Sequence, residues 1–319
     1  MEGNWPRLAV LGAGAVGCYF GGMLARAGAP VTLIGRPLHV GAIARHGLFI
    51  DGLHFQQHIQ VAASTEISTA RDAEVVLFCV KTLNTEEASR SLAPHLGPNA
   101  TVISLQNGVD NVERIRSASN IDAFAAVVYV AAAMTAPGRV KHSGRGDLIL
   151  GDLLGRARED EPRRRQLERL ASLFERAGVP CRVSNNVRGE LWLKMIINCA
   201  YNAISALGRA PYHRAGGNRW TRELMIKVTE EALEVARAAG VRLPDVDMVE
   251  TVLKISASMA NATSSTAQDL ARGKPTEIDS LNGYLVRRGA ELGVPTPVNQ
   301  TLHALVKLLE ESARPNPKP

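Results

Sequence analysis

Apolar and polar positions alternate along the first half of the chain in short blocks that predict strands separated by helices. Short apolar runs bounded by turn residues stand at 8–11, 31–34, 73–80 and 100–105. A stretch of small residues ending at Gly28 and a second helical stretch, 85–95, lie between these runs, and short polar strands are indicated around 48–61. Strands that alternate with helices in this way predict a parallel sheet.

The pattern changes in the middle of the chain. Apolar strands between 124 and 152 are broken by turn residues at 137–138 and 144–146, which predicts hairpins that extend one edge of the sheet. Beyond Ser184 the apolar positions follow a helical period and strand signals are few. We therefore expect a doubly wound α/β domain followed by an all-α domain, with boundaries 1–184 and 185–319.

The first apolar run leads directly into the turn Gly12-Ala13-Gly14-Ala15-Val16-Gly17. In a Gly-x-Gly-x-x-Gly turn the first glycine allows the tight bend, the second lets a pyrophosphate approach the backbone, and the third lets the helix pack on the strand. The helix then presents unpaired N–H groups to the anion. A glycine-rich turn alone is a weak signal. Here a strand precedes the turn, a helix follows it, and the second strand comes at the spacing of a βαβ unit. Together they predict a dinucleotide-binding domain of the Rossmann type, with residues 12–17 against the cofactor.

The second strand ends at Ile34-Gly35-Arg36, where an NAD-specific site carries a carboxylate for the ribose 2′-hydroxyl. Arg36 instead offers a planar fork of donors that suits a 2′-phosphate. The position therefore favours NADP(H) over NAD(H), and we expect NADPH as the cofactor. The alternative for Arg36 is an ordinary exposed loop arginine.

Two polar residues directly follow other predicted strands. Lys81 comes after the run 73–80, and Asn107 comes shortly after the run 100–105. Because the carboxyl ends of parallel strands face the ligand crevice, both residues lie where a cofactor or substrate could be contacted. The alternative is a surface lysine and a capping asparagine in ordinary loops.

Four polar residues, Glu190, Lys194, Asn198 and Asn202, recur every four positions in an otherwise apolar helical run. On a helix they form one polar stripe. A stripe that faced solvent would make this a plain amphipathic helix. Asparagine is a poor helix former, however, and the rest of the run is apolar enough for burial. We therefore favour a buried stripe, which requires a polar ligand because unpaired buried polar groups are costly.

A second polar cluster, 264–283, contains Ser265 and Glu277. Pro275 and Thr276 mark a helix start and put Glu277 in its first turn. A carboxylate at that place is either a partner of the helix dipole or a catalytic group. The residues alone do not choose between the two.

Composition narrows the classes of partner. With 319 residues, 45% hydrophobic and 21% charged, the chain has enough material for two domains with separate cores. No apolar run approaches the roughly 20 residues of a membrane span, and the four cysteines show no Cys-x-x-Cys pairing, as expected in a reducing cytoplasm. A net charge of +6 suits anionic ligands, while 4% aromatic residues offer no stacking surface for nucleic acid. We expect a cytoplasmic protein with a small-molecule substrate and no metal, membrane or nucleic-acid partner.

Several motifs together resemble those of the ketopantoate reductases (2-dehydropantoate 2-reductases) over nearly the whole chain. They are the glycine turn, Lys81-Thr82, Leu105-Gln106-Asn107-Gly108, Glu190-Leu191-Trp192-x-Lys194-x-x-x-Asn198-x-x-x-Asn202, Ser265-x-x-Gln268-Asp269 and Thr276-Glu277-Ile278-Asp279-x-x-Asn282-Gly283. The resemblance implies an NADPH-binding Rossmann domain and an all-α domain like those of the 6-phosphogluconate dehydrogenase group, with the substrate bound between them.

The same resemblance implies a role for each candidate residue. Lys194 would be the general acid that protonates the ketone oxygen and stabilises the developing alkoxide. Glu277 would hold the lysine side of the site and the substrate hydroxyl, and it is also counted among the cofactor ligands. The remaining roles are substrate binding for Asn198, Asn202 and Ser265, a place between substrate and cofactor for Asn107, and places near the cofactor for Lys81 and Arg36.

Two residues depart from the family pattern. Tyr212 stands where the family often has an asparagine, and Asn261 stands one residue away from an expected substrate contact. The reaction implied is the NADPH-dependent reduction of 2-dehydropantoate to pantoate, a step toward pantothenate and coenzyme A. The alternatives are the same chemistry on another 2-oxo acid, which the two departures motivate, and a redox sensor that binds NADP(H) without turnover. A homodimer is an open alternative to a monomer.

Overall fold

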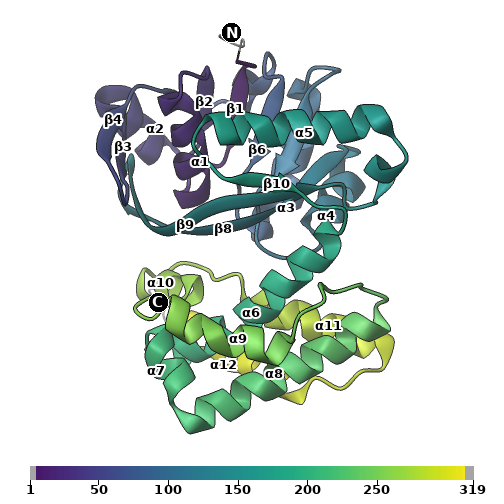
Figure 1. Ribbon diagram of the computed structural model, residues 1–319. Coiled ribbons are helices and arrows are strands. Elements are labelled where there is room, and N and C mark those ends of the chain that lie inside the picture. The colour runs from purple at the N-terminus through teal and green to yellow at the C-terminus, as the bar shows by residue number, and fades with distance from the viewer. Residues whose placement is uncertain (1–4, 313–319) are drawn as a thin grey trace, which may run out of the picture. The chain divides into compact units, whose positions relative to one another are not determined.

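The computed structural model describes residues 5–312 of the protein (Figure 1). The chain divides into two compact units, residues 1–187 and residues 188–319. The first unit holds every strand of the described chain, and the second unit is built from helices. This order confirms the expected fold class, an α/β sheet domain followed by an all-α domain.

A ten-stranded sheet forms the first unit. Its strands are β1 (Leu8–Leu11), β2 (Val31–Ile34), β3 (Leu48–Asp51), β4 (Gln56–Ile59), β5 (Ala62–Ser64), β6 (Val75–Phe78), β7 (Thr101–Ser104), β8 (Ala123–Ala136), β9 (Arg139–Gly151) and β10 (Cys181–Val183). Their order is β4-β3-β9-β8-β7-β6-β1-β2-β5, with β10 beside β9. The strands from β7 to β5 run parallel. The chain builds outward from β1 on one side and then returns to β6 on the other, so the ligand crevice of such a sheet lies at the carboxyl ends of β1 and β6.

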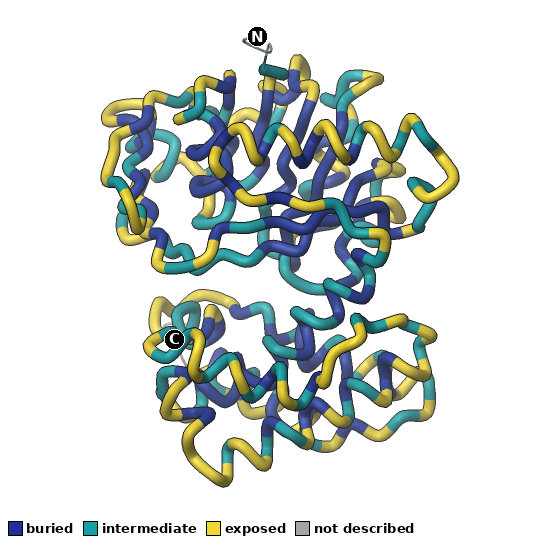
Figure 2. The backbone as a smooth tube through the Cα atoms, in the orientation of Figure 1, coloured by how far each residue is buried: buried dark blue, intermediate teal, exposed yellow. Residues whose placement is uncertain are grey.

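Helices cover both faces of this sheet. They are α1 (Ala15–Arg26), α2 (Pro37–His46), α3 (Thr85–Leu92), α4 (Asn111–Ser119) and α5 (Glu161–Arg176), with short 3₁₀ helices η1 (Ile67–Ala70), η2 (Thr82–Asn84), η3 (Ala93–His95) and η4 (Arg156–Arg158). Alternate residues of a strand point to opposite faces. Leu8 and Val10 of β1 therefore pack with α1 and α5, whereas Ala9 and Leu11 pack with α3 and α4. Figure 2 shows the central strands buried between these two layers.

Of the two turns predicted in the region of the long strands β8 and β9, the one at 137–138 is confirmed and the one at 144–146 is wrong. The turn at 137–138 joins the two strands, but the chain does not reverse at 144–146, where β9 continues along β8. Arg145 has φ +52° and Gly146 has φ +134°. The pairing register shifts at the same place, after Tyr129 of β8. The turn-forming residues thus make a β-bulge inside the strand instead of a second hairpin.

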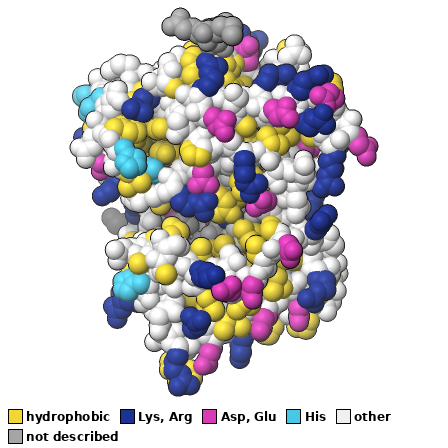
Figure 3. Space-filling view, in the orientation of Figure 1, with side chains coloured by type: hydrophobic (Ala, Val, Ile, Leu, Met, Phe, Trp, Pro, Cys, Tyr) yellow, Lys and Arg dark blue, Asp and Glu magenta, His cyan; other side chains and the backbone are white. Residues whose placement is uncertain are grey.

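Basic side chains on the surface are interspersed with acidic ones. The face in Figure 3 shows Lys and Arg side chains scattered among apolar and uncharged ones, with Asp and Glu beside several of them. In the first unit, Arg156 and Arg163 bind Asp122 at 2.6 Å and 2.9 Å, and both also contact Asp152. These ion pairs join η4 and α5 to residues that flank β8 and β9. The two arginines are therefore engaged within the fold.

The second unit contains α6 (Val187–Leu207), which begins at the end of the first unit, and the helices that follow it. These are α7 (Tyr212–Gly217), α8 (Arg219–Ala238), α9 (Met248–Ser258), α10 (Ser265–Ala271), η5 (Ile278–Ser280), α11 (Asn282–Leu292) and α12 (Pro297–Ser312). Trp192 and Tyr201 of α6 are the two largest fully buried side chains of the described chain. No helix within residues 5–312 is both long and apolar enough to cross a membrane.

Candidate active site

The glycine turn joins β1 to α1 at the carboxyl end of β1. Gly12 has φ +112°, and a Cβ there would lie 2.7 Å from the carbonyl carbon of Cys79. A Cβ on Gly17 would overlap the carbonyl oxygen of Gly12. A Cβ on Gly14 would meet no atom within 4 Å. The fold itself therefore needs Gly12 and Gly17, whereas Gly14 borders open space.

The open space in front of Gly14 suits a pyrophosphate. Gly14 is the N-cap of α1, it has no side chain to cap the helix, and the first turn of α1 carries no acidic residue. The first N–H groups of a helix have no partner within it, and the positive end of the helix dipole faces the same direction. The residues present therefore fit the phosphates of a dinucleotide.

The end of β2 packs directly on the glycine turn. The backbone N–H groups of Gly12 and Ala13 donate to the Ile34 carbonyl at 2.9 Å and 3.0 Å, and a Cβ on Gly35 would lie 2.6 Å from that of Ala13. Arg36 follows as the exposed N-cap of α2, whose first turn carries no carboxylate. The structure thus brings Arg36 to the same edge of the sheet as the turn, and nothing acidic in α2's first turn would repel a 2′-phosphate.

Lys81 and Asn107 lie in two loops that are tied together. Lys81 is the half-buried N-cap of η2, after β6, and Asn107 is a half-buried residue after β7. The hydroxyl of Thr82 donates to the Asn107 carbonyl at 2.9 Å, and Asn111 Nδ2 donates to the same oxygen at 2.6 Å. The structure therefore brings the two loops of these candidates together at the carboxyl ends of neighbouring strands.

A buried polar side chain, Gln106, lies beneath these loops. Its Nε2 donates to the Thr85 hydroxyl at 2.7 Å and to the Val80 carbonyl at 3.1 Å, and its Oε1 accepts from the Ser104 hydroxyl at 2.9 Å. Thr85 also lies 3.1 Å from Asn111 Oδ1, which completes the connection to Asn107. Sequence reasoning gave Gln106 no role. The signal was an amide directly after an apolar strand, where a buried polar group requires partners.

The polar stripe on α6 is only partly buried. Lys194 and Asn198 are half-buried, while Asn202 is buried at 3% exposure. Asn202 Nδ2 donates to the Ser265 hydroxyl at 3.4 Å, and the Asn202 carbonyl accepts from the Ser264 hydroxyl at 3.0 Å. The structure thus brings the start of α10 onto α6 and places Ser265 beside Asn202.

Pro275 and Thr276 predicted that Glu277 lies in the first turn of a helix, and this prediction is wrong. Glu277 is half-buried and directly precedes the three-residue helix η5, while α11 begins only at Asn282. Both the N–H and the hydroxyl of Thr276 bond to the Glu310 carboxylate of α12, and the Thr276 hydroxyl also accepts from the Ile278 N–H at 3.2 Å. Only the short helix η5 begins there. So short a helix has little dipole, so the explanation of Glu277 as a dipole partner loses its basis.

Asp279 of the same motif ties the segment of Glu277 to α12. Asp279 accepts hydrogen bonds from His303 Nε2 at 2.7 Å and from Lys307 Nζ at 2.9 Å. The bond from His303, followed by that from Lys307, holds the pKa of Asp279 well below its usual range in spite of partial burial. Lys307 also binds Glu310 at 2.9 Å. The segment that carries Glu277 is therefore fixed by charged contacts on both sides.

Asn282 connects this motif to α6. Its Nδ2 lies 3.2 Å from the Cys199 carbonyl and 2.9 Å from Asn299 Oδ1, to which it donates. Asn299 is held in turn by Glu231, whose carboxylate accepts from the Asn299 side chain at 2.7 Å. Because Cys199 follows Asn198 on α6, these bonds fix the helix that carries the stripe.

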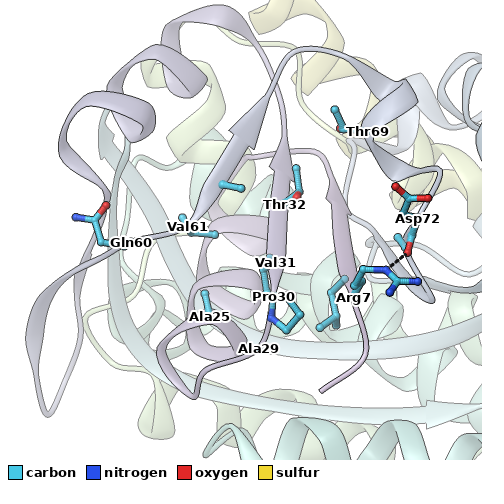
Figure 4. Close-up of a pocket in the computed structure, with 13 residues that line it drawn as sticks. Arg7, Ala25, Ala29, Pro30, Val31, Thr32, Gln60, Val61, Thr69 and Asp72 are labelled. Atoms are coloured by element: carbon cyan, nitrogen blue, oxygen red, sulfur yellow. Dashed lines mark hydrogen bonds between the residues drawn. The ribbon is translucent and has the colours of Figure 1, made fainter. Parts of the chain in front are cut away.

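The candidate residues thus fall into two groups, one in each unit. The first unit holds residues 12–17, Arg36, Lys81 and Asn107, and the second holds Lys194, Asn198, Asn202, Ser265 and Glu277. Figure 4 shows a pocket of about 430 Å³ that none of them lines. Its walls include Arg7, Pro30 and Asp72, which precede β1, β2 and β6. The pocket is therefore at the amino ends of the strands and is not the dinucleotide site of a parallel sheet.

A Rossmann-type unit with this glycine turn, followed by an all-α unit that carries a lysine, two asparagines, a serine and a glutamate, defines a nicotinamide-dependent oxidoreductase. Comparison with known families is more specific. The sequence model described as "Ketopantoate reductase PanE/ApbA" matches residues 8–155, and the one described as "Ketopantoate reductase PanE/ApbA C terminal" matches residues 186–310. The chain belongs to the ketopantoate reductase family, as its motifs predicted.

Individual proteins agree with this assignment. A 2-dehydropantoate 2-reductase of Pyrococcus horikoshii is 32% identical over 304 residues, which cover 95% of this chain and 97% of that protein. A crystal structure of a PanE/ApbA family ketopantoate reductase from Ralstonia eutropha is 47% identical, with a TM-score of 0.88, and covers 96% of this chain and 99% of that one. A D-mandelate dehydrogenase solved with NADH and anilino(oxo)acetate shares the fold, with a TM-score of 0.88 at 23% identity over 96% of this chain and 99% of that one.

Proposed function

We propose that this chain reduces 2-dehydropantoate to pantoate with NADPH, a step on the way to pantothenate and coenzyme A. The observation that carries the proposal is family membership along both units, from residue 8 to residue 310. The contacts of the second unit support it, because Ser265 of α10 bonds to Asn202 of α6, the helix that also carries Lys194. The cytoplasm is the expected compartment, since all four cysteines are free thiols.

In the first unit, the chain's own groups would hold the cofactor. The N–H groups at the start of α1 would bind the pyrophosphate, and Arg36 would bind the 2′-phosphate. Lys81 and Asn107, at the ends of β6 and β7, would contact the part of the cofactor nearer to the substrate. When bound, NADPH supplies the hydride for a 2-oxo acid.

In the second unit, Lys194 would protonate the ketone oxygen of the substrate from its ammonium group, and its charge would stabilise the alkoxide as it forms. Successive positions i and i+4 on a helix lie on the same face, so Asn198 follows Lys194 within reach of one small molecule. Asn198, Asn202 and Ser265 would bind the carboxylate and hydroxyl oxygens. Glu277 would hold the lysine side of the site and the substrate hydroxyl.

The test is the loss of NADPH absorbance on addition of 2-dehydropantoate. We expect Lys194→Ala to lower kcat by about 10²- to 10⁴-fold, the usual effect of a positioned general acid, in a variant that still folds. Lys274→Ala is the matched control because Lys274 is an exposed lysine of the same unit. Normal turnover by Lys194→Ala would show that the assignment of Lys194 is wrong.

A second candidate function is the same reduction of another 2-oxo acid. It is favoured by Tyr212, whose buried hydroxyl contacts Asn202 Oδ1 at 3.4 Å in the substrate half of the site. A residue that touches a substrate-binding side chain can change which acid is preferred. Values of kcat/KM for a series of branched and hydroxylated 2-oxo acids distinguish the two functions.

A further inference from the structure

Tyr212, at the start of α7, ends a chain of three polar side chains. Its phenol donates to Asn202 Oδ1 at 3.4 Å, and Asn202 Nδ2 donates to the Ser265 hydroxyl at 3.4 Å. Tyr212 is 8% exposed and Asn202 is 3% exposed. Burial leaves the amide oxygen without access to bulk water, so the phenol is its substitute for a water molecule.

The phenol is held in place independently of Asn202. The backbone N–H of Tyr212 donates to the Ala262 carbonyl at 2.9 Å, and its ring packs on the ring of Tyr201 with centroids 4.6 Å apart. Burial raises the pKa of Tyr212, which keeps the hydroxyl protonated and able to donate. The ring and the backbone thus present one fixed donor to the amide.

We propose that Tyr212 is a positioning residue that sets the orientation of the Asn202 amide. A side-chain amide has a donor end and an acceptor end, and it presents different groups when it turns over. With Oδ1 bonded to Tyr212, the N–H end faces Ser265. The amide N–H and the serine hydroxyl then favour an oxygen acceptor, such as the carboxylate of a 2-oxo acid. The kinetic part of this inference rests on the proposed function, whereas the orientation of the amide does not.

The kinetic test is Tyr212→Phe, which removes the phenol oxygen and keeps the ring. We expect KM for the 2-oxo acid to rise about tenfold, which corresponds to ~1.4 kcal/mol and is the size of one hydrogen bond. KM for NADPH and kcat should change little. In an Asn202→Ala background the same substitution should have no further effect on KM, because the two residues act through one contact.

Tyr201→Phe is the matched control. Tyr201 belongs to the same ring pair, but its phenol donates to the Val252 carbonyl at 3.0 Å and accepts from the Ser256 N–H at 3.1 Å. It should lower stability and leave KM for the 2-oxo acid unchanged. An unchanged KM in Tyr212→Phe, or an equal rise in both variants, would overturn the proposal.

A spectroscopic test needs no turnover. The two side-chain N–H signals of Asn202, identified in a ¹⁵N-labelled sample by their absence in Asn202→Ala, should move in Tyr212→Phe and stay in place in Tyr201→Phe. Signals that do not move in Tyr212→Phe would refute the positioning role. A wild-type chain that reduces no 2-oxo acid would contradict the proposed function alone, and the Asn202 signals would still decide the role of Tyr212.

Discussion

Gln106→Leu tests whether the buried amide beneath the Lys81 and Asn107 loops supports the cofactor side of the site. Gln106 is 5% exposed, and its side chain takes part in three hydrogen bonds, at 2.7, 2.9 and 3.1 Å. Leucine is similar in size and apolar, so the substitution removes the bonds and creates little empty space.

The expected loss follows from the partners left behind. The Ser104 hydroxyl and the Val80 carbonyl lose the bonds that Gln106 makes with them, whereas Thr85 still lies 2.9 Å from the Thr82 carbonyl. A buried polar group left without a partner costs about 1–3 kcal/mol. We expect the free energy of unfolding to fall by about 2–6 kcal/mol for the two groups together, and by less where a group finds another partner. KM for NADPH should rise as well, because the loops that carry Lys81 and Asn107 lose their common support.

Urea unfolding and NADPH titration measure the two effects. Gln166→Leu is the matched control, because Gln166 makes a single bond, to the Thr101 hydroxyl at 2.6 Å, at the amino end of β7. It should cost about 1 kcal/mol and leave KM for NADPH unchanged. The reasoning is refuted if Gln106→Leu is no less stable than Gln166→Leu, or if the two variants bind NADPH equally well.

Two further predictions concern the glycine turn and the acidic segment after α10. Gly14→Ala should fold with a stability within about 1 kcal/mol of the parent, because its Cβ meets nothing within 4 Å, and it should lose NADPH binding. Gly17→Ala should fail to fold normally, since its Cβ would overlap the Gly12 carbonyl. If Gly14→Ala binds NADPH as tightly as the parent in titration calorimetry, the role of Gly14 at the pyrophosphate is contradicted. Because the pKa of Asp279 is lowered in the folded chain, its contribution to stability is present above about pH 3.9, the unfolded value, and is lost as the pH falls further. Asp279→Asn should therefore unfold more easily than the parent at pH 7, with a difference that shrinks below pH 4, and a difference independent of pH in urea melts would argue against the His303 and Lys307 pairs as its cause.

Local patterns were enough for the parts of the fold in which neighbours in sequence decide the structure. The continuous apolar runs 8–11 and 73–80 predicted strands of a covered parallel sheet, and the strands β1 and β6 lie between two cores. The helices α2 and α4 were not predicted, because each buries only one or two side chains, such as Ile43 or Ile115, and so shows almost no apolar period.

Contacts distant in sequence explain the rest. The residues at 144–146 look like a turn, but they pair with β8 and stay in a strand. Their positive φ angles occur at a β-bulge in that strand. Pro275 and Thr276 look like a helix start, but Thr276 is bound by Glu310, 34 residues later, and only the short helix η5 follows. The partners of Gln106 and Tyr212 come from other elements, and no spacing in the sequence indicates them. The candidate residues could thus be proposed from the sequence, whereas their hydrogen-bond partners in other elements could not.

The most direct measurement is kcat/KM for a series of 2-oxo acids, each with NADPH and with NADH. We expect the highest value for 2-dehydropantoate with NADPH, as the family, the glycine turn and Arg36 together imply. Turnover of a different 2-oxo acid in preference would move the substrate assignment to that acid. The absence of turnover with every acid, or a preference for NADH, would contradict the proposed reaction or the role of Arg36.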